Sequence, residues 1–180
     1  MNRGLINVAL GIVALGVAGF LAAQSVPGLL PGSDKDAYGD WAVRCIERKG
    51  MVPCDIVQSV NDTKTKQTIM QVSYSYEPSK DQYAAQIRLP LGFLLPAGVL
   101  IRLDGKKDIT NYQVTRCEAE GCFIEKLSKS AELGPFRNAE QGMVVVMGKD
   151  GKPVALPFSL KGFGDALDSM AGRNKRAADK

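Results

Sequence analysis

The chain has 180 residues with 23 Lys and Arg against 19 Asp and Glu, a formal net charge of +4, and no histidine. Histidine is the most common general base, so catalysis would have to rest on carboxylates, lysines or a serine–lysine couple. Most of the positive excess lies in the last residues, so the rest of the chain is close to neutral and we expect no nucleic-acid partner.

An uncharged apolar run, Leu5–Ala23, follows Arg3 and contains Asn7 as its only polar side chain. A helix rises about 1.5 Å per residue, so this run nearly matches the hydrocarbon core of a bilayer. We expect it to insert into the inner membrane through residues 5–23. Arg3 would remain in the cytoplasm by the positive-inside rule, which places the rest of the chain outside.

Whether this leader is cleaved depends on the residues that end it. A cut after one of the closing alanines would place Leu21 or Phe20 at the upstream specificity position, where small residues are preferred. We therefore favour an uncleaved signal anchor over residues 1–24, which gives a periplasmic domain held at the inner membrane. The alternative is a cleaved signal peptide and a periplasmic or secreted domain.

Composition divides the remaining chain into three parts. Residues 25–37 contain two prolines and two glycines, which indicates an irregular linker. Residues 38–171 are enough for one domain with a hydrophobic core and too few for two. Residues 172–180 combine Lys and Arg with small residues and are predicted to be a frayed basic tail.

The four cysteines form two couples that are close in sequence, Cys45 with Cys54 and Cys117 with Cys122. Four cysteines allow three pairings and the sequence alone does not choose among them, although local pairing closes each loop most simply. Neither spacing is typical of a zinc site or a redox dithiol, and export supplies an oxidising compartment. We expect structural disulfides and no cofactor, so reduction should destabilise the domain and chelation should not.

Alternation of apolar and polar residues with a period of two indicates half-buried strands. The apolar faces comprise Trp41, Val43 and Cys45; Met70, Val72, Tyr74 and Tyr76; Tyr83, Ala85, Ile87 and Leu89; Val99, Ile101 and Leu103; Tyr112 and Val114; and Val154, Leu156, Phe158 and Leu160. Met143–Met147 is continuously apolar, which predicts a strand covered on both faces. Turn residues separate these segments, so we predict a mainly β fold, an antiparallel β-sandwich or barrel.

One or two short helices are predicted to accompany the strands, and the leader would form a transmembrane or signal helix before them. A helix within residues 128–141 would be broken or start late because of Gly134 and Pro135. A second helix over Gly162–Ala171 has its apolar residues at helical spacing, which is typical of a helix that covers a core.

Five segments together resemble the invasion-associated locus B family over roughly residues 38–170. They are Gly39–Cys45, Leu89–Gly92, Gly98–Gly105, the Cys117–Cys122 couple and Leu160–Phe163. That family consists of exported proteins of Gram-negative bacteria and is named for a member linked to host-cell invasion. The resemblance implies no enzymatic reaction, cofactor or defined binding residue.

Several other segments could suggest chemistry or binding. Ser128-Lys129-Ser130 and Ser159-Leu160-Lys161 bring serine near lysine, but adjacent strand residues point to opposite faces. Asp34–Asp36 and Asp104–Asp108 lack the regular oxygen ligands of a calcium loop, so we interpret them as turns. An aromatic stacking platform is the alternative to a core position for Trp41, Tyr74, Tyr76 and Tyr83.

The stretch Leu89–Leu103 is unusually apolar for a region rich in proline and glycine. We expect it to enter the core, and the alternative is an exposed apolar ridge for a partner or lipid. The sequence as a whole predicts a non-enzymatic, disulfide-stabilised envelope domain that binds an envelope protein or cell-surface component. The alternative is a periplasmic lipid or small-molecule carrier with an apolar cavity.

Overall fold

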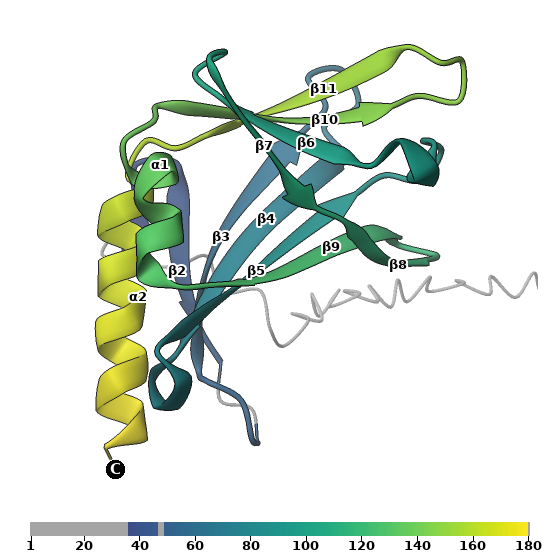
Figure 1. Cartoon of the computed structure of the whole chain (residues 1–180). Coiled ribbons are helices and arrows are strands. Elements are labelled where there is room, and N and C mark those ends of the chain that lie inside the picture. Colours follow the sequence, from purple (N-terminus) through teal and green to yellow (C-terminus); the bar gives the residue numbers. More distant parts are fainter. Residues whose placement is uncertain (1–35, 47–48, 180) are drawn as a thin grey trace, which may run out of the picture. The chain divides into compact units, whose positions relative to one another are not determined.

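The computed structural model describes residues 36–46 and 49–179. They form two antiparallel β-sheets with a long C-terminal helix, α2, which confirms the mainly β prediction (Figure 1). The strands are β1 (Ala37–Tyr38), β2 (Trp41–Cys45), β3 (Cys54–Asn61), β4 (Thr68–Glu77), β5 (Gln82–Leu89), β6 (Val99–Leu103), β7 (Lys107–Tyr112), β8 (Val114–Glu118), β9 (Gly121–Ser128), β10 (Gln141–Met147) and β11 (Pro153–Ser159).

The seven-stranded sheet has the order β1-β2-β3-β4-β5-β9-β8, and the four-stranded sheet has the order β11-β10-β6-β7. Their apolar faces enclose the core, which is why the alternating residues of β4, β5 and β6 are buried as predicted. A single residue, Gln113, separates β7 from β8. The chain therefore crosses from one sheet to the other at that edge.

At β11, the other edge of the small sheet, the side chain of Gln58 from β3 joins the two sheets. It is 7% exposed, and its Nε2 donates to the carbonyls of Asp40 (3.0 Å) and Ser159 (3.1 Å). Its Oε1 accepts the amide of Ser159 at 2.8 Å. One side-chain amide thus supplies the hydrogen bonds that a neighbouring strand would otherwise provide.

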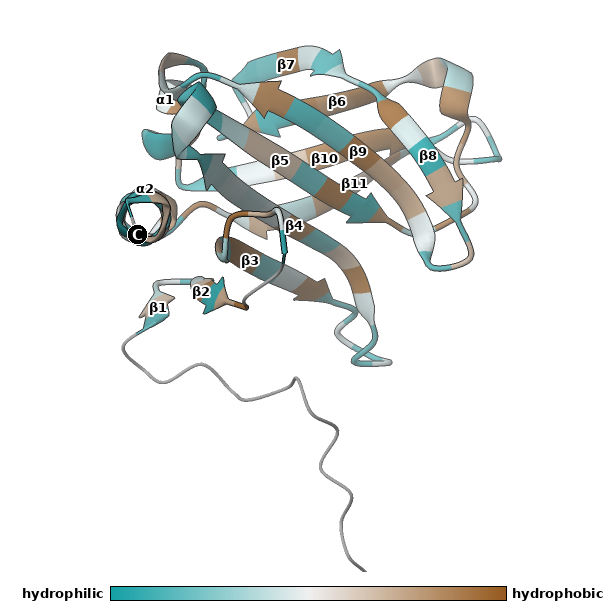
Figure 2. Ribbon diagram, turned by 90° about the horizontal axis from the view of Figure 1, so that it is seen from below, coloured by the Kyte–Doolittle hydropathy of each residue, from teal (hydrophilic) through white to brown (hydrophobic). Residues whose placement is uncertain are grey.

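Helix α2 (Phe163–Ala178) contacts β2, β3 and β4 and covers the part of the large sheet that the small sheet leaves open (Figure 2). The helix is longer than predicted, so the expectation of a frayed tail from residue 172 is wrong as far as Ala178. The reason is Asn174, which is buried at 1% exposure. Its side chain fixes the second half of the helix against the sheet.

The predicted interruption in residues 128–141 is confirmed, because a 3-10 turn, η4 (Ser130–Leu133), precedes the short helix α1 (Gly134–Arg137). Two further 3-10 turns are η2 (Pro78–Lys80) and η3 (Leu95–Ala97). No helix in the described part of the chain is long and apolar enough to cross a membrane. The predicted leader, residues 1–24, lies outside the described residues.

Three expectations about strands are corrected. Cys45, expected on the core face of β2 with Trp41 and Val43, is exposed at the end of the strand. In β10, Val144 and Val146 are buried but the alternate residues are half-buried, so the strand is not fully covered on both faces. Val154, expected on the core face of β11, is 42% exposed near the hairpin end. The outer face of the small sheet at β10 and the hairpin end of β11 are thus partly open to solvent, which the apolar composition does not reveal.

Both local cysteine pairings are present as disulfides. Cys45 lies opposite Cys54 across β2 and β3, with their Cα atoms 4.1 Å apart. Cys117 lies opposite Cys122 across β8 and β9, with a Cα separation of 4.0 Å. Each disulfide therefore ties together two neighbouring strands of the large sheet.

Two segments from the ends of the domain contact each other in what we call the terminal clasp, residues 39–41 with residues 159–163. The amide of Asp40 donates to Lys161 O at 3.1 Å, and Trp41 Nε1 donates to Ser159 O at 3.0 Å. Gly162 has φ +81°, and a Cβ there would lie 2.2 Å from Tyr38 O. This close backbone approach requires glycine.

Two buried tyrosines predict an alkaline loss of stability. Tyr74 and Tyr112 are both buried, and burial raises the pKa of Tyr112 from 10.0 to about 12. The folded state then keeps a proton that the unfolded chain releases, so stability falls as the pH rises from about 10 to about 12, by about 2–3 kcal/mol for this group. Urea unfolding across that pH range measures the loss, and Tyr112→Phe should reduce it. An unchanged unfolding midpoint would contradict the prediction.

Candidate binding surfaces

Large apolar side chains that are exposed among the described residues fall mainly into two surfaces. They are Ile46, Met51, Leu91, Leu94, Leu95, Leu127 and Val154. The first surface is the outer-face groove, on the side of the large sheet that faces away from the core, and it contains Ile46, Met51 and Leu127. The second is the leucine loop, Pro90–Ala97, which contains Leu91, Leu94 and Leu95.

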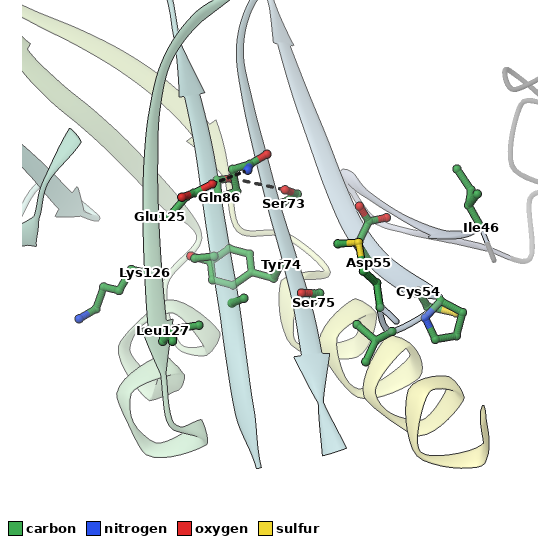
Figure 3. A pocket seen from close by; sticks show the side chains of 15 residues that line it. Ile46, Cys54, Asp55, Ser73, Tyr74, Ser75, Gln86, Glu125, Lys126 and Leu127 are labelled. Atoms are coloured by element: carbon green, nitrogen blue, oxygen red, sulfur yellow. Dashed lines mark hydrogen bonds between the residues drawn. The ribbon is translucent and has the colours of Figure 1, made fainter. Parts of the chain in front are cut away.

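The outer-face groove has a volume of about 430 Å³ and crosses strands β3, β4, β5 and β9. Its lining residues are Ile46, Met51, Val52, Pro53, Cys54, Asp55, Ser73, Tyr74, Ser75, Ala84, Ala85, Gln86, Glu125, Lys126 and Leu127. Figure 3 shows Ile46 and Leu127 on opposite sides of the groove, with Ser73 and Ser75 between them.

The groove exists because small residues alternate with core residues along the central strands. The strand register places Ser75 next to Ala84, and Ala84 next to Leu127. Short side chains form the floor, while Leu127, 61% exposed, stands up from β9 on one side and Met51, 62% exposed, belongs to the other. The Cys45–Cys54 disulfide ties the strands that carry this second wall.

Two carboxylates lie at the groove, and both already have partners. Asp55 accepts two hydrogen bonds from Arg44, at 2.7 and 3.2 Å. Glu125 pairs with the Arg116 guanidinium, and this hydrogen bond lowers the pKa of Glu125, with a smaller contribution from Gln86. The groove therefore combines apolar walls with charged and polar groups held in fixed positions, which suits binding better than proton transfer.

The leucine loop corrects the expectation that the whole of Leu89–Leu103 enters the core. Its flanks, in β5 and β6, are buried, but Leu91, Leu94 and Leu95 are 56%, 42% and 49% exposed. The loop lies at the end of the sheets away from α2 (Figure 1). The alternative interpretation, an exposed apolar ridge, is thus the correct one for this part of the chain.

The four aromatics considered for a stacking platform are all core residues. Trp41, Tyr74, Tyr76 and Tyr83 have exposures of 1%, 2%, 4% and 5%. The ring of Phe163 from α2 packs 5.0 Å from Trp41 and 5.1 Å from Tyr74, measured between centroids. The aromatic rings are therefore packed against other core side chains and are not available for stacking with a ligand. The core interpretation of these four residues is confirmed.

The serine–lysine segments are used in local structure. Lys129 Nζ donates to the carbonyls of Lys80 (2.7 Å) and Asp81 (3.0 Å). Ser159 Oγ accepts the backbone amide of Lys161. In neither segment does the structure give a hydrogen bond between a lysine ammonium and a serine hydroxyl among these described residues.

The acidic turn residues also have structural partners. Asp104 Oδ1 accepts the backbone amides of Glu140 and Gln141, and Asp108 forms an ion pair with Arg102 that lowers the pKa of Asp108. The described residues contain no group of three or more Cys, Asp or Glu placed to hold a metal ion. Of Asp34–Asp36, only Asp36 lies in the described part, and its carboxylate accepts from Arg173.

The sequence did not indicate the outer-face groove. Its residues come from four strands and from the segment between β2 and β3, and a serine or alanine on the outer face of a strand has no distinctive pattern. The leucine loop did have a signal, the apolar composition of Leu89–Leu103, although its exposure was not the favoured expectation.

Two antiparallel sheets with a terminal helix across the large sheet define a β-sandwich-like fold, and this fold has a solved counterpart. The crystal structure of invasion associated protein B from Bartonella henselae superimposes with a TM-score of 0.69. That comparison covers 78% of this chain and 96% of that one at 19% identity, and it shows a shared fold.

The family model for the Invasion associated locus B (IalB) protein matches residues 41–171, and the chain belongs to this family. Two invasion protein B homologs of Brucella abortus, from strain 2308 and from biovar 1 strain 9-941, are each 25% identical over 178 residues. These alignments cover 97% of this chain and 99% of each relative. The resemblance of the five sequence segments to this family is thereby confirmed.

Proposed function

We propose that this chain is an exported, non-enzymatic binding module of the bacterial envelope that holds an apolar segment of a partner protein in the outer-face groove. The observation that carries the proposal is the pair of exposed apolar walls, Met51 and Leu127, on either side of a small-residue floor. An apolar centre with a polar rim is the usual composition of protein interfaces. Desolvating the exposed leucine and methionine favours association.

The proposed compartment is the periplasm, with the domain anchored in the inner membrane by an uncleaved leader over residues 5–23. Cleavage of the leader would leave the domain periplasmic or secreted. The two disulfides support an oxidising compartment, and membership of the family supports export. The relatives are named for invasion, and a role of this chain in host-cell contact belongs to the same proposal.

A carrier of lipid or small molecules is the second candidate. The groove volume of about 430 Å³ favours it, because small-molecule sites span roughly 300–1,000 Å³. The ligand would lie in the groove, since aromatic side chains such as Trp41 and Phe163 fill the space beneath α2.

Site-specific photo-crosslinking in intact envelopes tests the proposal. A photoreactive amino acid replaces Leu127 in the tagged full-length chain, and the matched control carries it at Ser59, which is exposed on the same outer face beyond the groove. One envelope protein should be captured from position 127 and not from position 59. Capture of no protein, or equal capture from both positions, would reject the groove as the binding site.

The two disulfides provide a second matched comparison. Replacing Cys45 and Cys54 by serine frees the strands that carry one groove wall, so capture from position 127 should fall. Replacing Cys117 and Cys122 leaves the groove walls intact, and capture should persist. Each loss should cost about 2–3 kcal/mol of stability, so a thermal melt must first show that both variants are folded.

Native mass spectrometry of the purified full-length chain separates the two candidates. The carrier function would be favoured if a lipid or small molecule stays bound to the native chain and is lost from the Leu127→Glu variant. A chain without such a ligand that still captures one protein would support the interaction module.

A further inference from the structure

We propose that the leucine loop inserts its side chains into the surface of a phospholipid bilayer. This second binding surface is separate from the outer-face groove and goes beyond the proposed function. The loop presents Leu91, Leu94 and Leu95 to solvent with exposures of 56%, 42% and 49%. Exposed apolar groups gathered on one short projection are typical of interaction or membrane sites.

The chemistry of the loop favours lipid over a specific protein partner. From Leu89 to Ile101 the sequence contains no charged side chain and none that can form a hydrogen bond. Specific protein recognition depends on placed donors and acceptors around an apolar centre, and this loop offers only non-directional apolar contact. Non-directional apolar contact is sufficient for binding to lipid acyl chains.

The backbone of the loop is also suited to a medium without water. In hydrocarbon, each unpaired N–H or C=O carries a large penalty. The Leu94 amide donates to Met147 O at 2.7 Å, and the Gly98 amide donates to Leu95 O at 3.0 Å across the η3 turn. Pro90 and Pro96 have no N–H to satisfy. These backbone hydrogen bonds therefore lower the free-energy cost of transferring the leucine loop from water into a bilayer.

The loop is held rigidly at its base and is flanked by lysines. Phe93 packs against the core and forms an antiparallel bridge with Gly148, in the turn between β10 and β11. That turn carries the exposed residues Lys149, Asp150 and Lys152, with one net positive charge. The β8–β9 turn, next to Leu89 at the base of the loop, carries exposed Glu118 and Glu120. The lysines that can meet an anionic bilayer surface beside the apolar tip are therefore those of the β10–β11 turn.

The expected signal anchor would also keep the loop near lipid. The segment from residue 24 to residue 36 can extend over at most about 45 Å. A retained leader would therefore give the domain a high effective concentration at the bilayer, so that weak insertion is sufficient.

Depth-dependent fluorescence quenching in the full-length chain tests the proposal. It reports on the membrane insertion of one position, independently of whether the leader also inserts. Leu94→Trp is reconstituted into vesicles of phosphatidylethanolamine and phosphatidylglycerol whose acyl chains carry bromine. The matched control is Leu127→Trp, which is 61% exposed in the groove. Trp41 is the single native tryptophan and is 1% exposed, so it adds a constant background.

Bromine should quench the tryptophan introduced at position 94 and not the one at position 127. Adding Leu91→Ser and Leu95→Ser should lower membrane partitioning of the loop by more than roughly tenfold. The same melting temperature is expected because these side chains are exposed. Lys149→Gln with Lys152→Gln should reduce quenching in vesicles with phosphatidylglycerol more than in phosphatidylcholine alone.

Quenching at neither position, or equally at both, would overturn the proposal. A blue shift of the position-94 emission with solubilised envelope proteins, without any quenching by brominated lipid, would assign the loop to a protein and also overturn it. Crosslinking from position 127 does not depend on the loop, so failure of this proposal is distinguishable from failure of the proposed function.

Discussion

Replacing Asn174 by leucine should lower the free energy of unfolding by about 3–5 kcal/mol. The Asn174 side chain lies between the ends of β3 and β4. Its Oδ1 accepts the Cys54 amide at 2.9 Å, and its Nδ2 donates to Cys54 O at 3.0 Å and Tyr76 O at 2.9 Å. The last paired residues at this end of β3 and β4 are Asp55 and Ser75. Beyond them, the side-chain amide of Asn174 forms hydrogen bonds to the backbone of both strands.

Leucine has the same branched arrangement of non-hydrogen atoms but leaves three buried backbone groups without these partners, and each unsatisfied group costs about 1–3 kcal/mol. Urea unfolding followed by the fluorescence of buried Trp41 measures the effect. Arg176→Ala, on the exposed side of the same helix, is the control and should change stability by less than about 0.5 kcal/mol. Equal stability of Asn174→Leu and the native chain would show that the amide is not required.

Replacing Phe163 by alanine should cost about 3–5 kcal/mol of unfolding free energy. Phe163 is fully buried at the first turn of α2, and its ring lies 5.0, 5.1 and 6.3 Å from the rings of Trp41, Tyr74 and Phe136. Truncation leaves a cavity that three neighbouring rings cannot fill without moving. The edge-to-face contact with Tyr74 and the tilted contacts with Trp41 and Phe136 are lost in addition.

Phe163→Leu provides the graded control, because it keeps most of the apolar volume and should cost less than the alanine variant. The melting temperatures of both variants, recorded with the Trp41 emission spectrum, make the comparison. A red shift in the folded alanine variant would report water near Trp41. Stability loss below about 1 kcal/mol for alanine would show that the helix closes the cavity by shifting.

The sequence predicted the strands whose two faces differ cleanly. β5 and β6 alternate buried and half-buried residues along their whole length, and β4 does so from Ile69 onward, so the period of two is visible. β3 was missed because adjacent Ile56 and Val57 are both buried and Gln58 is buried as well. Gln58 occupies a core position through its bonds to another sheet, which no local pattern can indicate.

The same limit explains the errors at α2 and at the leucine loop. Asn174 and its charged neighbours suggest a solvated tail, yet tertiary hydrogen bonds continue the helix through them. Leu91 and Leu94 suggest burial, yet the strands on either side end before the loop and leave it outside. Hydrophobicity predicts what a residue prefers, whereas packing decides where it lies.

The terminal clasp has a consequence for the order in which the domain folds. The hydrogen bond between Trp41 and Ser159 joins residues 118 apart, and that between Cys54 and Asn174 joins residues 120 apart. Such high contact order means that the core cannot close while the chain is still emerging from a ribosome or crossing a membrane. Until α2 is available, the apolar surface that it covers on β2, β3 and β4 stays open to solvent.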